Sequence, residues 1–219
     1  MLADRRWPQI ARGATLVVPV GALEQHGPHL PLDTDAVIAA AVAEQLGERW
    51  GAEVAPVVAY GASGEHQSFP GTLSIGTSAL ATVLVELARS ATTWADRVVF
   101  VNGHGGNLPA LRRAVELLVA EGRDVGWLPC APRGGAGDAH AGRDETSMML
   151  HLAPERVRVD AAEAGATEPL ADLMPAMVAG GVAAVSANGV LGDPAGATAE
   201  EGARLLGSIV ADADQRVAG

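Results

Sequence analysis

The sequence predicts an α/β fold in three layers, α/β/α, with a largely parallel sheet. Two observations support this class. Short, near-continuous apolar runs alternate along the chain with segments that have the periodicity of amphipathic helices. Each apolar run is followed directly by a polar, glycine-rich segment, which is typical of the carboxyl ends of strands in open α/β sheets. The 219 residues suit one domain, and we expect residues 1–219 to form it because no linker divides them.

Four apolar runs are the predicted strands: 15–20, 55–60, 97–101 and 124–130. They are hydrophobic throughout, whereas a strand with one solvated face would alternate between apolar and polar residues. We therefore expect strands that are buried on both faces, as in a parallel sheet.

The helical segments between these runs are predicted over residues 34–50, 78–94 and 108–121, and a last helix is predicted to begin at Thr198. Thr198 and Glu201 have the spacing of a capping box, in which each side chain bonds the backbone N–H of the other residue. His151, within the apolar run MMLHL, is expected to be a packed helix residue.

Composition excludes several classes of function. The net charge of −11 argues against nucleic acid or an anionic membrane as the main partner, because either needs a basic face. The only cysteine, Cys130, excludes an internal disulfide framework and suits a reducing compartment. No signal-peptide run or bilayer-spanning segment is present in the sequence, so we expect a cytoplasmic protein.

The segment after the first predicted strand is unusually rich in metal-binding side chains. Glu24 and His26 are two residues apart, so in extended chain both would point to one side and Gln25 to the other. Asp33 and Asp35 lie at the start of the next helix, where carboxylates are favoured. We interpret Asp33 as a helix N-cap and Asp35 as a metal ligand, because a carboxylate can bridge two cations.

Two further segments carry candidate ligands. His104 lies in NGHGGN after the third predicted strand, where Asn102 and Asn107 are expected to fix the loop by side-chain bonds to backbone. A phosphate-binding turn is a weak alternative here, because the segment matches no phosphate-binding motif and has no basic residue. His140 and Glu145 lie in HAGRDETS; taken alone, they could be a loop histidine and a helix N-terminal acid.

The interpretation as a metal site depends on convergence. Five of the six histidines follow predicted strands: His26, His29, His66, His104 and His140. Together with Glu24, Asp35 and Glu145 they offer imidazole and carboxylate ligands, which suit Zn, Mn or Fe(II). Because one cysteine cannot form a closed thiolate site, the sequence predicts an open metal site at the carboxyl edge of the sheet.

These motifs together resemble the creatininase (creatinine amidohydrolase) family, over about residues 15–210. The matching motifs are the segment from Glu24 to Asp35, GEHQSFPGT, NGHGGN and HAGRDETS. The resemblance implies a three-layer α/β/α fold and an amide-hydrolysing centre of two divalent metal ions per chain, with Zn expected and Fe(II) or Mn as alternatives.

The resemblance also implies a ligand set. One metal would be held by Glu24, Asp35 and His104, and the other by His26, the bridging Asp35 and a second carboxylate. In creatininase that carboxylate lies two residues after the histidine of NGH, where this chain has Gly106. We therefore expect Glu145 to take its place, and His140 to be the catalytic residue that orients the carbonyl or gives a proton to the leaving amine.

A peptide is the expected substrate. Creatininase closes tryptophans over creatinine, whereas residues 131–147 of this chain contain no aromatic residue. Segments 60–67, 97–107, 115–127 and 180–194 most resemble a branch of the family that removes a modified C-terminal Val–Tyr dipeptide from a precursor peptide. The alternatives are an amidohydrolase or deformylase acting on a small cyclic amide or formamide, and a metal-binding protein without turnover.

Three expectations stay open at this point. Glu65 and His66 could line the substrate mouth or brace the SFPG turn. Residues 165–196, rich in Ala, Gly and Met, have no clear period and could serve an interface or the substrate mouth. A homo-oligomer, with a hexamer expected, is implied by the family resemblance alone.

Overall fold

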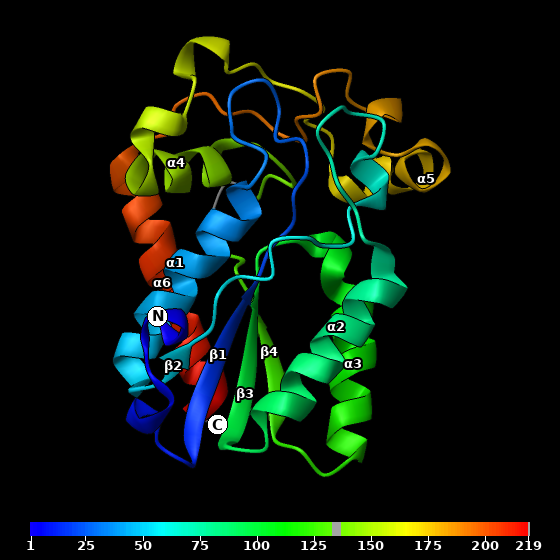
Figure 1. The fold of residues 1–219 in the computed structure, drawn as a ribbon. Helices are drawn as coiled ribbons and strands as arrows, with labels where there is room; N and C mark the ends of the chain where they lie inside the picture. Colours follow the sequence, from blue (N-terminus) through cyan, green and yellow to red (C-terminus); the bar gives the residue numbers. More distant parts are fainter. Residues whose placement is uncertain (133–136, 219) are drawn as a thin grey trace. The chain divides into compact units, whose positions relative to one another are not determined.

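A computed structural model describes residues 1–132 and 137–218 (Figure 1). These residues form two compact units, each built from separate stretches of chain. The sheet unit comprises Met1–Ala22, Asp35–Ala62 and Ile75–Cys130. The helical unit comprises Leu23–Thr34, Ser63–Ser74 and the described residues of the range Ala131–Gly219. The expectation of a single domain stays a prediction.

The sheet has four parallel strands in the order β2-β1-β3-β4. Their bounds are Ala14–Val20 for β1, Glu53–Val54 for β2, Ala95–Asn102 for β3 and Val125–Pro129 for β4. In register, Val17 of β1 lies beside Val99 of β3, which lies beside Gly126 of β4. The predicted parallel sheet and three of the four predicted strands are therefore confirmed.

The predicted strand 55–60 is wrong. The strand is only Glu53–Val54, and the following residues make a single further bridge, between Val20 and Val58. Pro56 and Pro19 of β1 each lack an N–H to donate. A regular hydrogen-bond ladder between β1 and residues 55–60 is therefore interrupted. The segment still follows β1, because Val58 N–H donates to the Pro19 carbonyl at 2.9 Å.

Three helices belong wholly or mainly to the sheet unit: α1 (Thr34–Trp50), α2 (Gly76–Ala91) and α3 (Leu108–Ala120). The predicted helix 34–50 is confirmed at both ends, and the other two are confirmed with shifted ends. α2 ends earlier than predicted because Thr92 caps it: both its N–H and its hydroxyl donate to the Ala88 carbonyl. Figure 1 shows α2 and α3 side by side against the sheet.

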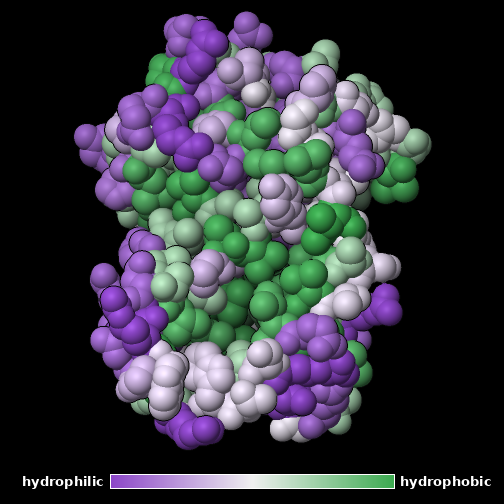
Figure 2. Space-filling model, viewed as in Figure 1, coloured by the Kyte–Doolittle hydropathy of each residue, from purple (hydrophilic) through white to green (hydrophobic). Residues whose placement is uncertain are grey.

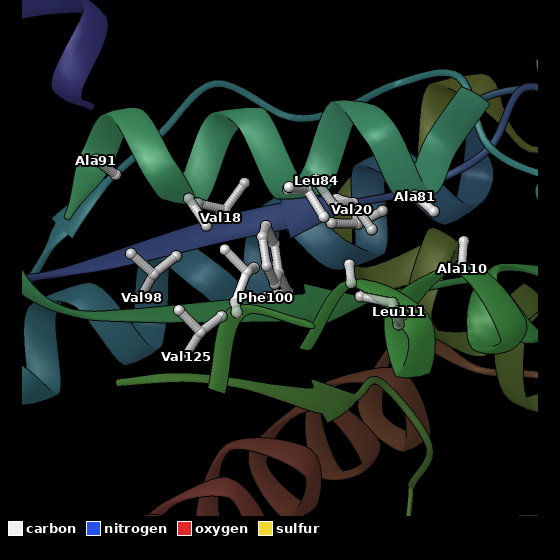
Figure 3. Packing of buried hydrophobic residues seen from close by; sticks show 14 of the residues in the cluster. Val18, Val20, Ala81, Leu84, Ala91, Val98, Phe100, Ala110, Leu111 and Val125 are labelled. Atoms are coloured by element: carbon white, nitrogen blue, oxygen red, sulfur yellow. The ribbon is translucent and has the colours of Figure 1, made fainter. Parts of the chain in front are cut away.

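One face of the sheet packs on α2 and α3 in a continuous apolar core (Figure 3). Phe100 of β3 has no exposed surface and lies in this core with Leu84 of α2 and Leu111 of α3. Because aromatic residues are only 3% of the chain, aliphatic side chains and alanine fill the remaining space.

The first turn of α1 approaches the carboxyl end of β3 from the other face of the sheet. A Cβ atom on Gly103 would lie 2.5 Å from the Asp35 carbonyl oxygen, closer than real Cβ contacts allow. Glycine at this position therefore permits the approach that puts Asp35 beside the NGH loop.

The helical unit contains α4 (Arg143–Leu152), α5 (Leu170–Gly180) and α6 (Ala199–Ala218). One of the two hydrogen bonds of the predicted capping box is present at the start of α6: Glu201 N–H donates to Thr198 Oγ1 at 3.1 Å. The other half is wrong: Thr198 N–H donates to Ser147 Oγ of α4, and the Glu201 carboxylate accepts from Arg143. These partners connect the two helices, so tertiary contacts replace the local motif.

The outcomes for His151 and for the segment 165–196 also belong to this unit. His151, predicted to be packed, is exposed on α4. The segment without a clear period contains α5, whose Leu170, Met174 and Val178 are exposed, and Figure 2 shows hydrophobic residues at the surface over this helix. A helix that is apolar on its exposed side has no amphipathic period to reveal it in the sequence.

Short 3-10 helices cover Leu2–Asp4, Trp7–Gln9, Gly64–His66, Gly105–Asn107, Pro154–Arg156, Val159–Ala161 and Val182–Ala184. Within residues 1–132 and 137–218, none of the helices combines the length and the apolar character needed to cross a bilayer.

We expect Phe100→Ala to lower the free energy of unfolding by about 3–5 kcal/mol, because it leaves a large cavity in the core between β3, α2 and α3. Leu117→Ala on the exposed side of α3 (44% exposed) is the matched control and should change stability by about 0.5 kcal/mol or less. Urea unfolding followed by circular dichroism measures both. Equal losses in the two variants would contradict the described packing.

Candidate metal centre

Four of the six predicted site residues come together within the helical unit. His26, His140 and Glu145 offer ligand atoms within 4.8 Å of one another, and so do Glu24, His66 and His140. The His140 ring lies between two others, with ring-centroid distances of 4.3 Å to His26 and 4.4 Å to His66. Four of these five residues are buried, and only Glu145 is partly exposed.

Backbone hydrogen bonds hold the segments that carry this cluster. Glu24 N–H donates to the Leu32 carbonyl at 2.9 Å, which closes the loop that contains His26. His140 and Leu191 exchange both of their backbone hydrogen bonds, at 3.2 and 2.8 Å. These backbone bonds restrain the loops that carry the ligands, as a site of several ligands requires.

Backbone carbonyl groups determine which nitrogen of two histidines carries the proton. His26 Nδ1 lies 3.1 Å from the Glu24 carbonyl oxygen, and His140 Nε2 lies 2.7 Å from the Gln25 carbonyl oxygen. A carbonyl oxygen can only accept, so each of these nitrogens donates. In the neutral rings the lone pair is therefore on the opposite nitrogen, His26 Nε2 and His140 Nδ1.

Each of these lone pairs faces a carboxylate. His26 Nε2 lies 3.9 Å from Glu145 Oε2, and His140 Nδ1 lies 3.7 Å from Glu24 Oε1. A neutral ring nitrogen and an ionised carboxylate are both acceptors, so a metal ion or an added proton between them would make each of these contacts favourable. Glu145 is aimed at this point by the Ala141 N–H, which donates to its Oε2 at 2.6 Å.

The other two predicted ligands, Asp35 and His104, form a pair within the sheet unit. His104 Nε2 lies 3.3 Å from the Ala62 carbonyl oxygen, and its Nδ1 lies 3.5 Å from Asp35 Oδ2. The pattern of His26 is thus repeated: the N–H bonds a backbone carbonyl and the other nitrogen faces a carboxylate. Both residues are buried.

The two asparagines of the NGHGGN loop hold it as predicted. Asn102 Nδ2 donates to the His104 carbonyl at 2.7 Å. Asn107 Nδ2 donates to the Gly21 carbonyl, and its Oδ1 accepts from Ala62 N–H at 2.8 Å. Asn107 therefore connects the loop to the end of β1 and to the residue whose carbonyl orients His104.

This donor set fits divalent metal ions. Imidazole nitrogens and carboxylate oxygens are the ligands of Zn, Mn and Fe(II). Metal-binding histidines usually donate their second N–H to a carbonyl or carboxylate, which fixes the ring and its tautomer. His26 and His104 each meet both conditions, with Glu145 and Asp35 as their carboxylate neighbours.

Gln25 is a member of the cluster that sequence reasoning missed. It was expected to point away from Glu24 and His26, and this is wrong: its side chain is buried, with Nε2 2.9 Å from His66 Nδ1. The alternation of strands does not apply because β1 ends at Val20. No feature of the sequence marks this departure.

Three further residues singled out in the sequence are His66, Glu65 and Asp33. His66 lies in the cluster, whereas Glu65 belongs to none of the ligand groups found among the described residues. Asp33 directly precedes α1, and its carboxylate accepts from Arg156 Nη2 at 2.6 Å. Its role as an N-cap stays a prediction.

His29 is buried beside the cluster in a form that resists protonation. Its Nε2 lies 2.9 Å from Thr146 Oγ1. Burial, and secondarily the charge of nearby His26, lower the pKa of His29 from 6.5 to about 4. Neutral His29 therefore stabilises the fold above pH 6.5, and this contribution is lost as pH falls towards 4, because the unfolded chain takes up the proton first.

We expect His29→Gln to remove a pH-dependent part of the stability, on the order of 3 kcal/mol between pH 6.5 and 4. Unfolding free energies measured across this range should fall less steeply in His29→Gln than in the wild type. His151→Gln, on the exposed side of α4, is the control and should keep the wild-type slope. An unchanged slope in His29→Gln would contradict the buried neutral state.

Comparison with known proteins identifies the family of this chain. The Creatininase family model, described as creatinine amidohydrolase, matches residues 3–217. A mycofactocin precursor peptide peptidase of Mycolicibacterium smegmatis is 58% identical over 92% of this chain and 83% of its own length. Another of the same description, from Mycobacterium tuberculosis, is 58% identical over 93% of this chain and 84% of its own.

Solved structures are similar over most of the chain. A mutant creatininase complexed with creatine has a TM-score of 0.82 at 28% identity, covering 99% of this chain and 96% of that one. A manganese creatininase has a TM-score of 0.77 at 30% identity, covering 93% of this chain and 90% of that one. A mutant creatininase of Zn–Zn type has a TM-score of 0.76 at 30% identity, covering 93% and 89%. The predicted α/β fold is confirmed, and the chain belongs to the creatininase family.

Proposed function

We propose that this chain is a dinuclear metal-dependent peptidase that cleaves the mycofactocin precursor peptide and releases its modified C-terminal Val–Tyr dipeptide. The observation that carries the proposal is the pairing of histidine lone pairs with carboxylates at His26–Glu145 and His104–Asp35. The high identity to peptidases of that description, over most of both chains, supports the substrate.

The proposal assigns Asp35 and His104, with Glu24, to one metal ion. It assigns His26 and Glu145, with Asp35 shared, to the other. The support for each metal is its acceptor pair, in which the histidine N–H is already bonded to a backbone carbonyl. Zn and Mn are both compatible with the donor set, and both occur in the names of related creatininase structures.

When bound, the divalent cations would polarise the scissile carbonyl and lower the pKa of water to about 7, which supplies a nucleophile at neutral pH. The chain's own residues have to hold the ligands and handle protons. Glu24 and Glu145 contribute negative charge in a largely buried cluster, where its attraction for a cation is weakly screened.

His140 is the proposed acid–base residue. Its Nε2–H is bonded to the Gln25 carbonyl, so the ring is held in one orientation. Its Nδ1 faces Glu24, and this nitrogen can take up a proton and give it to the leaving amine of the peptide. Ala141, directly after it, has a φ of 52°, a strained conformation for a residue other than glycine, as is common at functional sites.

We expect purified protein with zinc to release the dipeptide from the modified precursor peptide. His26→Ala and Asp35→Ala should abolish release, because each removes a ligand of a proposed metal, and a chelator should abolish it reversibly. Mass spectrometry of the products measures release, and His151→Ala is the matched control. Full activity of metal-depleted Asp35→Ala would contradict the proposal.

The same assay separates the two other interpretations. Turnover of creatinine or a small formamide, with no cleavage of the peptide, would favour a small-amide hydrolase of the family. A wild-type protein that binds well under one metal ion per chain would favour a non-catalytic role.

We expect His140→Ala to lower kcat by about 10²–10⁴-fold, the usual contribution of a general acid–base residue, while zinc content stays at the wild-type value. Elemental analysis and steady-state kinetics of the same preparation measure both quantities. Loss of one zinc ion per chain in His140→Ala would show that His140 is a ligand instead.

The expected hexamer and the cytoplasmic location stay predictions from the sequence and the family resemblance.

A further inference from the structure

Among the buried histidines described above, His66 has a different hydrogen-bonding pattern from His26, His104 and His140. His26, His104 and His140 each bond a backbone carbonyl through one nitrogen and face a carboxylate with the other. His66 instead contacts the side-chain nitrogen of Gln25 with its Nδ1, at 2.9 Å. The orientation of the Gln25 amide therefore decides which His66 nitrogen carries the proton.

That amide is fixed by two backbone groups of opposite polarity. Gln25 Oε1 accepts from Gly27 N–H at 2.8 Å, and Gln25 Nε2 donates to the Gly189 carbonyl at 2.9 Å. Exchanging oxygen and nitrogen would turn both bonds into repulsive contacts. Glycine at 189 leaves room for this arrangement, because a Cβ there would lie 2.0 Å from Gln25 Oε1.

The tautomer of His66 follows from this orientation. The Gln25 amide has two hydrogens, one for the Gly189 carbonyl and one for His66 Nδ1. Its 3.1 Å approach to His140 Nε2 needs no hydrogen bond, since that nitrogen already donates to the Gln25 carbonyl. His66 Nδ1 thus accepts, and the proton of the neutral ring is on Nε2.

The Nε2–H of His66 points at a proposed metal ligand. His66 Nε2 lies 3.3 Å from Glu24 Oε1, and both side chains are buried. A protonated ring nitrogen cannot bind a metal ion, but it can donate a hydrogen bond that orients the carboxylate and stabilises its charge.

We propose that His66 is a positioning residue for Glu24 and not a metal ligand, and that Gln25 imposes this role by fixing the His66 tautomer. This inference rests on the proposed function, because it gives His66 a part in the same metal centre. His66 thereby has a different role from His26 and His140, although all three histidines lie in one cluster.

Long-range proton–nitrogen NMR correlation spectra of the zinc-loaded protein test the tautomer directly. His66→Gln serves to assign the His66 signals. We expect a neutral His66 ring with its proton on Nε2 and no metal-bound nitrogen, whereas His26 should show a metal-bound Nε2. A proton on Nδ1, or a metal-bound Nε2, in His66 would overturn the inference.

Zinc titrations of matched variants test the role. In His66→Gln the new amide N–H can replace the Nε2–H donor, so we expect the wild-type number of zinc ions and an affinity within about 10-fold of wild type. His66→Leu has no donor and should keep the zinc number but bind about 10–100-fold more weakly. His26→Gln, the control at a ligand position, should lose one zinc ion per chain.

The outcomes separate this inference from the proposed function. Loss of a zinc ion in His66→Gln, as in His26→Gln, would make His66 a ligand while leaving the metallopeptidase intact. A wild-type protein that binds no zinc would instead remove the metal centre, and with it the positioning role of His66.

Discussion

Hydrogen bonds from histidine rings to backbone carbonyls are the interaction on which the candidate site depends. The carbonyls of Glu24, Gln25 and Ala62 accept from His26, His140 and His104. Each bond fixes a tautomer and leaves the second nitrogen facing a carboxylate at 3.5–3.9 Å. Such facing acceptors are unfavourable in a buried place unless a cation or a proton lies between them. A divalent cation held between such a histidine and carboxylate would therefore stabilise both side chains.

The fold provides these carbonyls at defined positions. In the sheet unit, β3 leads directly into the His104 loop, and the close approach of α1 at Gly103 puts Asp35 beside it. In the helical unit, backbone pairing of His140 with Leu191 holds the third histidine. The core around Phe100 does no chemistry, but it sets the relative positions of β3, α2 and α3 from which the His104 loop extends.

Much of this arrangement could be predicted from local sequence. Continuous apolar runs identify β1, β3 and β4, and the period of residues 34–50 identifies α1 from end to end. Ligand residue types were also predictable, because glutamate, aspartate and histidine follow the strands. The prediction for residues 55–60 failed because hydrophobicity alone does not show where prolines in adjacent segments interrupt the hydrogen bonds between strands.

The residues that hold the candidate ligands in place were not predictable in the same way. The roles of Gln25 and His66 depend on hydrogen bonds to each other and to Gly189, which are distant in sequence. The capping box at Thr198 failed for a related reason, since Ser147 and Arg143 of α4 take the places of its local partners. Local motifs predict local bonds, and contacts between segments can replace them.

We propose that metal ions occupy the spaces between His26 and Glu145 and between His104 and Asp35. A crystal structure of the zinc-loaded protein, with anomalous scattering recorded at the zinc edge, tests it most directly. We expect anomalous density in contact with His26 Nε2 and Glu145, and further density in contact with His104 Nδ1 and Asp35. Zinc bound elsewhere, with both pairs bridged only by protons, would contradict it.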